Sequence, residues 1–209
     1  MKSITEFKII LWDFDGVIMD SMPIRGQGFK EVLKNYPQQQ VDGLLAFHKL
    51  NGGLSRYVKF KYFFEIIRGE PISNEQVLEL ADKFSKIMLD LLIDEKLLIK
   101  DSLEYIKYAW MNHDMHIVSG SDGKELNIIC QSLGLSKYFK SVNGSPTPKN
   151  ELVKNVISIN SYDKNNIALI GDSINDQEAS KVNNIAFFGY NNINLNKSNY
   201  IESLNKLIS

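Results

Sequence analysis

The chain has 209 residues, of which 44% are hydrophobic and 23% are charged, a composition that is typical of a folded globular protein and argues against a disordered or fibrous chain. Its 24 Lys and Arg residues are balanced by 25 Asp and Glu residues, so a nucleic-acid partner has no electrostatic support. No apolar run reaches the ~18–20 residues that cross a bilayer, and the N-terminus MKSITEFK lacks the hydrophobic core of a signal peptide. We therefore expect a cytoplasmic protein without a membrane partner.

The first predicted strand, at residues 8–15, carries the apolar run IILW into Asp13 and Asp15. The next stretch shows no strand pattern and is interpreted as four helices, at 24–36, 41–50, 54–69 and 73–92. An all-helical block inserted after the first strand predicts a helical cap domain at 21–100 on a core domain formed by residues 1–20 and 101–209.

The second half of the chain alternates between helices and short apolar strands. Helices are expected at 101–112, 122–135 and 149–159, and strands at 115–122, 139–145, 166–173 and 184–190. This alternation is typical of a parallel sheet that helices cover on both faces. The predicted fold class is therefore α/β, with a Rossmann-like parallel-sheet core and an inserted all-helical cap. A final helix is expected at 200–208.

Polar residues that suit one kind of chemistry lie at or just beyond the carboxyl ends of the predicted strands. In chain order they are Asp13, Asp15, Gly16, Ser119, Gly120, Lys149, Asp172 and Asp176. Ligands of open α/β sheets bind beyond the carboxyl ends of the strands, so we expect these residues to converge there. Two buried carboxylates at one strand end require a compensating positive charge.

This set of residues suits the transfer of a phosphoryl group. Mg²⁺ prefers oxygen ligands, which Asp13 and Asp172 could supply. The Lys149 ammonium, the Ser119 hydroxyl and the backbone N–H groups near the two glycines could surround the phosphate oxygens. A carboxylate nucleophile would form an aspartyl phosphate. Asp15 could protonate the leaving oxygen and later accept a proton from water.

These residues form four motifs in chain order: DFDG at 13–16, HIVSGS with Ser119, GSPTPKNEL with Lys149, and GDSIND with Asp172 and Asp176. Together they resemble the four motifs of the haloacid dehalogenase-like superfamily, whose members are mostly Mg²⁺-dependent phosphatases. The insertion point of the helical block is similar to that of phosphoglycolate phosphatases and β-phosphoglucomutases. The resemblance implies that Asp13 is the nucleophile and a metal ligand. It implies that Asp15 is the general acid and base and that its backbone carbonyl also binds the metal.

The resemblance also assigns the later motifs. It implies that Ser119 and Lys149 hold the phosphoryl group and that Asp172 binds Mg²⁺ directly. Asp176 is then a second acidic position of the metal site, which acts through water or orients Lys149.

The predicted cap contributes two candidate substrate contacts, Arg25 and Arg56. The segment Gly53-x-Ser55-Arg56 resembles one that places an arginine on the distal phosphate in β-phosphoglucomutase-like caps. The alternative is that Ser55 caps a helix and Arg56 is solvated. Arg25 stands where the resemblance leads us to expect a histidine in a mutase, which weakens a mutase function and makes Arg25 a candidate contact to an anionic substrate.

Three functions stay open at this point. The leading one is a Mg²⁺-dependent phosphatase, a monomer or small homo-oligomer, that acts on a small phosphorylated metabolite such as a sugar phosphate or a phosphorylated acid. The second is a phosphomutase, and the third is a non-enzymatic phosphate-sensing or regulatory protein. The single cysteine, Cys130, lies in an apolar helical stretch and is expected to be a buried core residue.

Overall fold

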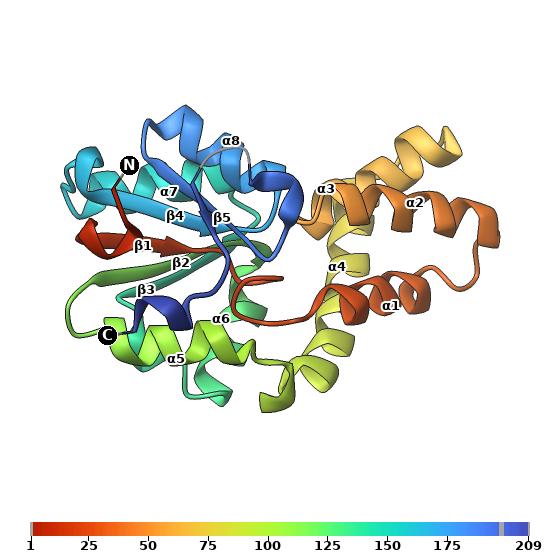
Figure 1. The fold of residues 1–209 in the computed structure, drawn as a ribbon. Helices are drawn as coiled ribbons and strands as arrows, with labels where there is room; N and C mark the ends of the chain where they lie inside the picture. The colour runs from red at the N-terminus through yellow and green to blue at the C-terminus, as the bar shows by residue number, and fades with distance from the viewer. Residues whose placement is uncertain (1, 197–198, 209) are drawn as a thin grey trace.

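Six parallel strands form one sheet in the computed structural model, which describes residues 2–196 and 199–208 (Figure 1). The strand order is β3-β2-β1-β4-β5-β6, and the bounds are β1 (Ile9–Trp12), β2 (Asp114–Asp122), β3 (Ser141–Ser145), β4 (Ile167–Gly171), β5 (Ala186–Tyr190) and β6 (Tyr200–Ile201). All neighbouring strands pair in parallel, and Trp12 lies between Ile117 and Ile170. The five predicted strands are present, and the α/β class is confirmed.

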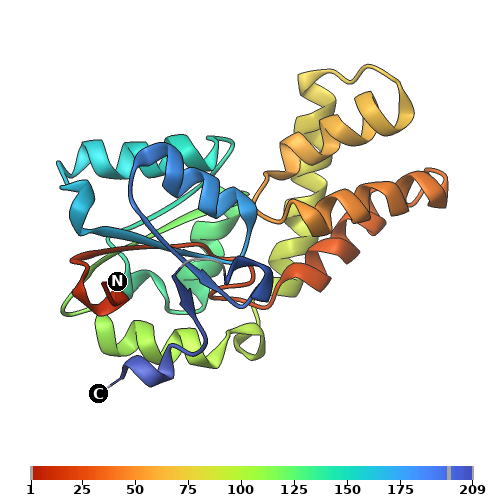
Figure 2. The same ribbon diagram turned by 45° about the horizontal axis from the view of Figure 1, so that its top comes forward.

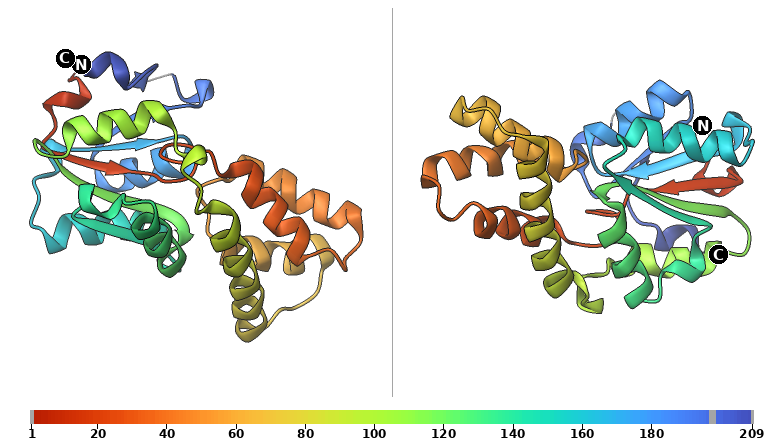
Figure 3. Two further views of the ribbon diagram at one scale, coloured as in Figure 1. Left: turned by 90° about the horizontal axis from the view of Figure 1, so that it is seen from below. Right: turned by 180° about the vertical axis from the view of Figure 1, so that it is seen from behind.

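Helices cover both faces of this sheet (Figures 1 and 3). One face carries α5 (Lys100–Ala109) and α6 (Gly123–Ser132), and the other carries α7 (Lys149–Ile159) and α8 (Ile174–Asn183). Short 3₁₀ turns lie at Ile4–Glu6, Glu95–Leu97, Ser136–Tyr138, Lys164–Asn166, Ile193–Leu195 and Asn205–Leu207. Across the described residues, no helix is both long and apolar enough to cross a membrane.

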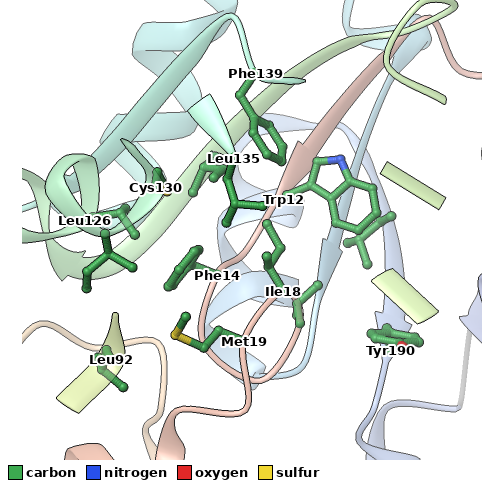
Figure 4. Close-up of a cluster of buried hydrophobic side chains, with 14 of the residues drawn as sticks. Trp12, Phe14, Ile18, Met19, Leu92, Leu126, Cys130, Leu135, Phe139 and Tyr190 are labelled. Carbon is green, nitrogen blue, oxygen red and sulfur yellow. The ribbon is translucent and has the colours of Figure 1, made fainter. Parts of the chain in front are cut away.

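The central strand β1 is buried on both sides, which fixes the direction of the residues that follow it. Side chains alternate along a strand, so Trp12 packs in the cluster that includes α5 and α6, whereas Leu11 packs with α7 and α8. Figure 4 shows Trp12 in the first cluster together with Leu126 and Cys130 of α6. The same alternation directs Asp13, immediately after the strand, to the side of α7 and α8.

Four helices between β1 and α5 form a helical insert, residues 22–92, beyond the carboxyl end of the sheet (Figures 1, 2 and 3). They are α1 (Met22–Val32), α2 (Gln38–Leu50), α3 (Arg56–Tyr62) and α4 (Asn74–Leu92), and α3 continues as a π-helical turn at Phe63–Arg68. The insert packs around Phe29, whose ring centroid lies 5.4 Å from that of Phe60 and 4.5 Å from that of Phe84. All four predicted helices are present. The division into a cap domain and a core domain stays an interpretation.

The end of the chain does not form the helix that was predicted for residues 200–208. Tyr200–Ile201 extend the sheet as β6, and a 3₁₀ turn follows at Asn205–Leu207. The Asp101 carboxylate of α5 accepts hydrogen bonds from the backbone N–H groups of Leu204 and Asn205, at 2.7 and 2.9 Å. These contacts hold the segment in a turn, so the prediction of a helix was wrong.

Candidate active site

Three carboxylates meet at the carboxyl end of the sheet, where β1 and β4 are neighbours. Asp13 follows β1, Asp172 follows β4, and Asp176 lies in the first turn of α8. One oxygen from each lies within 4.8 Å of the others. Ser173 begins α8 with a capping box: its backbone N–H donates to Asp176 Oδ2 at 3.0 Å, and its Oγ accepts from the Asp176 backbone N–H at 3.3 Å. The Ser173 hydroxyl also donates to Asp176 Oδ2 at 2.6 Å. The GDSIND motif therefore fixes Asp172 and Asp176 relative to the strand end.

Lys149, the first residue of α7, offsets part of this negative charge. Its Nζ lies 2.8 Å from Asp13 Oδ1 and donates a hydrogen bond to Asp176 Oδ1. Burial alone would lower the pKa of Lys149, but the charges of Asp13 and Asp176 outweigh burial and raise that pKa above its ordinary value. Both oxygens of Asp176 have partners, Lys149 and Ser173. This arrangement favours a role for Asp176 in positioning Lys149.

One lysine does not balance three carboxylates. Burial and the charge of Asp176 raise the pKa of Asp13 well above its ordinary value. Burial and the same neighbouring charge raise the pKa of Asp172 to about 7. Asp13 Oδ1 is buried, and its polar partner is the Lys149 ammonium at 2.8 Å. A divalent cation fits this oxygen donor set, and its charge would reverse both pKa shifts. Asp13 and Asp172 are the residues that could hold Mg²⁺, and Asp176 lies beside them, where it binds Lys149 and Ser173.

Asp15 makes its contacts at the junction with the helical insert, apart from the three-carboxylate cluster. It accepts hydrogen bonds from the Ser21 hydroxyl, from Ser121 Oγ at 2.5 Å and from Arg25 Nε at 2.5 Å. Burial alone would raise the pKa of Asp15, but the Arg25 charge and the hydrogen bonds from Ser121 and Ser21 hold it below its ordinary value. The carboxylate form, which can accept a proton, is therefore favoured. The metal contact expected through the Asp15 backbone carbonyl stays a prediction.

Gly16 allows the loop after β1 to approach Asp172 closely. Its φ is +81°, and a Cβ atom at this position would lie 2.1 Å from Asp172 Oδ2. Two asparagines support the same region: Asn191 Nδ2 donates to the Gly16 carbonyl at 3.0 Å, and Asn192 Nδ2 donates to the Asp172 carbonyl at 2.7 Å. Neither asparagine was predicted from the sequence as part of the site. Their position directly after β5 was the signal that could have identified them.

The end of β2 meets the helical insert. Ser119 is buried, and its Oγ accepts a hydrogen bond from the Ser121 backbone N–H at 3.1 Å. Gly120 packs against the insert, because a Cβ atom there would lie 2.3 Å from the Gly53 carbonyl oxygen. A cavity of about 290 Å³ lies beside this contact and is lined by Gly53, Gly120 and Lys149, among others. This volume suits a small-molecule ligand.

Both predicted substrate-binding arginines are buried against one glutamate, Glu125. Arg25 Nη1 lies 3.1 Å from Glu125 Oε1, and Arg56 Nη1 lies 2.6 Å from Glu125 Oε2. Ser55 does cap α3, but Arg56 is 4% exposed and is not the solvated arginine of the alternative interpretation. Glu125 was not predicted from the sequence as part of the site. Asp122 caps α6 and sets Glu125 in its first turn, where a single glutamate carries no distinctive sequence signal.

Two other titratable side chains are structural. Cys130 is buried, and burial raises the pKa of its thiol to about 12, as expected for a core residue. His116 is buried, with its Nδ1 2.7 Å from Ser141 Oγ, and burial lowers its pKa to about 4.

The parallel sheet and the inserted helices define a Rossmann-like α/β protein with an acidic site at the strand ends. Residues 10–190 match the family of haloacid dehalogenase-like hydrolases, so the chain belongs to this family. No curated protein matches the chain.

Solved structures with a similar fold come from the same superfamily. A predicted phosphoglycolate phosphatase from Haemophilus somnus is 15% identical, with 98% of each chain covered and a TM-score of 0.72. A β-phosphoglucomutase from Clostridium difficile is 18% identical, with 96% of this chain and 93% of that chain covered and a TM-score of 0.76. The HAD-hydrolase YfnB from Bacillus subtilis, described as bound to magnesium, is 15% identical, with 97% of each chain covered and a TM-score of 0.72. At these identities the likeness shows the fold.

Proposed function

We propose that this chain is a Mg²⁺-dependent phosphatase that hydrolyses a small phosphorylated metabolite through an aspartyl phosphate on Asp13. The observation that carries the proposal is the surroundings of Asp13, with Lys149 Nζ 2.8 Å away and the carboxylates of Asp172 and Asp176 beside it. Membership of the haloacid dehalogenase-like hydrolases and the magnesium bound by YfnB support it.

In the proposed reaction the Asp13 carboxylate attacks phosphorus, the bond to the leaving oxygen breaks, and an aspartyl phosphate forms. Lys149 and the Ser119 hydroxyl stabilise the phosphoryl oxygens. Mg²⁺ held by Asp13 and Asp172 supplies the positive charge that lets a carboxylate approach a phosphate dianion. Asp15 protonates the leaving oxygen, and then accepts a proton from the water that attacks phosphorus and restores Asp13.

The contacts of Asp15 connect this proton transfer to the helical insert. Arg25 on α1 holds Asp15 as a carboxylate, so Asp15 gains a proton more readily when Arg25 moves away from it. The insert lies against β2 through Gly53 and Gly120, which limits the access of water to the site. We therefore expect the substrate to enter when the insert shifts, and Arg25 to exchange partners as it binds.

The test is phosphate release from a panel of phosphomonoesters, with and without Mg²⁺, for the wild type, Asp13→Asn and Asp20→Asn. Asp20 is an exposed residue of the same loop and serves as the matched control. We expect Mg²⁺-dependent release from the wild type and from Asp20→Asn, and a loss of about a thousandfold or more in Asp13→Asn. Release that survives Asp13→Asn would contradict the mechanism.

Two other results would identify the alternative functions. Phosphoryl uptake on Asp13 without phosphate release, with turnover only when a sugar bisphosphate primer is added, would identify a phosphomutase. Phosphate binding without phosphoryl uptake from any donor would identify a non-enzymatic phosphate-binding protein.

A further inference from the structure

A second buried chamber lies between the helical insert and the end of β2, next to Asp15. Its charged and titratable lining residues are Asp15, Arg25, His48, Arg56 and Lys59. With the insert in this position the chamber measures about 20 Å³, room for about one water molecule, so a substrate group enters it only after the shift of the insert proposed above. Leu54 and Gly120 line both this chamber and the larger cavity beside Lys149. When the phosphate of a substrate lies at Asp13, the organic part of that substrate therefore lies next to this chamber.

Lys59 is a buried cation without an acidic partner among the described residues. It is 3% exposed, and its Nζ donates to the Gly52 carbonyl at 3.0 Å. Lys149, also buried, contrasts with it because carboxylates of Asp13 and Asp176 flank its ammonium. Burial of an ammonium without a counter-ion is strongly unfavourable. A ligand with a negative charge would remove this penalty at Lys59.

The other charges around the chamber balance one another. Arg25 lies between Asp15 and Glu125, and Arg56 pairs with Glu125, so two cations face two carboxylates. Lys59 leaves one uncompensated positive charge.

Two hydrogen-bonding groups around the chamber are also unused. Within the described part of the chain, Nη2 of Arg25 and Nη2 of Arg56 are buried without a hydrogen-bond partner. A group with several acceptor oxygens could satisfy them together.

We infer that this chamber selects phosphomonoesters whose organic part carries one negative charge, such as a carboxylate, and that Lys59 is the specificity-determining residue. A carboxylate supplies one charge and several acceptor lone pairs, which match the Lys59 ammonium and the free guanidinium N–H groups. A second phosphate brings excess charge, which Glu125 repels, and a neutral sugar leaves Lys59 uncompensated. The inference rests on the proposed function and narrows its substrates to small phosphorylated acids.

The test compares acids with matched alcohols and a bisphosphate. We would measure kcat/KM for phosphoglycerate against glycerol phosphate, for phosphogluconate against glucose phosphate, and for fructose bisphosphate. The wild type is expected to prefer the acid of at least one pair by about tenfold or more, and to turn over the bisphosphate less well than that acid.

In Lys59→Met, kcat/KM is expected to fall about tenfold for the acids and little for the alcohols. Lys61→Met, on the same helix but not lining the chamber, is the matched control. Glu125→Gln is expected to shift the preference toward the bisphosphate.

The inference would be overturned if the wild type preferred the alcohols or the bisphosphate, or if Lys59→Met kept the preference for acids. Neither result would contradict the proposed phosphatase function. A wild type that releases no phosphate would instead contradict the proposed function. Calorimetric binding of the same compounds to Asp13→Asn, with and without Lys59→Met, then tests whether the chamber binds the acid group, independently of catalysis. Weaker binding of the acids alone in the double variant supports the inference, and unchanged binding overturns it.

Discussion

Replacing Gly16 by alanine has two effects that can be measured separately. It strains the backbone after β1, and it displaces the Asp172 side chain. An L-residue at φ +81° costs about 1–2 kcal/mol. The added Cβ would lie 2.1 Å from Asp172 Oδ2 and 2.8 Å from its Cγ. Rotation of the Asp172 side chain relieves this clash at little cost in stability, but moves an oxygen proposed to bind Mg²⁺. We expect Gly16→Ala to lower the free energy of unfolding by about 1–2 kcal/mol. We expect the Mg²⁺ concentration for half-maximal phosphate release to rise about tenfold or more.

Gly134→Ala provides the matched control for this prediction. Gly134 also has a positive φ, +66°, but no atom lies within 4 Å of a Cβ built there. Urea unfolding and Mg²⁺ titration of phosphate release would be measured for both variants. Similar losses of stability, with a weaker Mg²⁺ response in Gly16→Ala alone, would support the reasoning. Equal Mg²⁺ half-saturation in the two variants would refute it.

Three further substitutions test separate parts of the structure. Lys149→Met is expected to lower phosphate release about a hundredfold or more at saturating Mg²⁺, because the phosphoryl oxygens lose their cation; retention of a tenth of the activity would contradict this role. Gly120→Ala would place a Cβ atom 2.3 Å from the Gly53 carbonyl oxygen and displace the helical insert. Small-angle scattering should then give a larger radius of gyration, and an unchanged value would argue against that contact. Burial lowers the pKa of His116 from 6.5 to about 4, so the unfolded chain binds more protons between these pH values and stability falls as the pH drops through them. His116→Gln should reduce that fall in urea unfolding, and an unchanged pH dependence would count against it.

The convergence of the candidate site residues could be predicted from the sequence because it follows from the properties of parallel sheets. Their strands end at a common edge, so Asp13 after the first strand and Asp172 after a later one were expected to meet. β1 pairs with β4, and one oxygen of Asp13 lies within 4.8 Å of one oxygen of Asp172, so the two side chains do meet. Lys149 could be placed for a similar reason, since it begins the helix that follows β3. Local sequence patterns and the order of the strands are therefore sufficient to predict where these residues lie.

Contacts between residues that meet only through the packing of separate elements could not be predicted from local sequence patterns. The contact between Glu125 and Arg56 depends on how the helical insert lies against β2 and α6, which no local pattern encodes. The burial of Lys59 depends on the same placement, because its helix pattern alone does not distinguish it from a solvated lysine. The final helix was wrongly predicted because Asp101, remote in sequence, binds the backbone at Leu204.

The central claim is that Asp13 accepts the phosphoryl group. Borohydride reduces an aspartyl phosphate to homoserine, so the enzyme would be quenched during turnover, reduced and mapped by peptide mass spectrometry. This conversion is expected at Asp13 in the wild type, only when both substrate and Mg²⁺ are present, and is expected to be absent in Asp13→Asn. Phosphate release with no modification, or with modification at another carboxylate, would contradict the account.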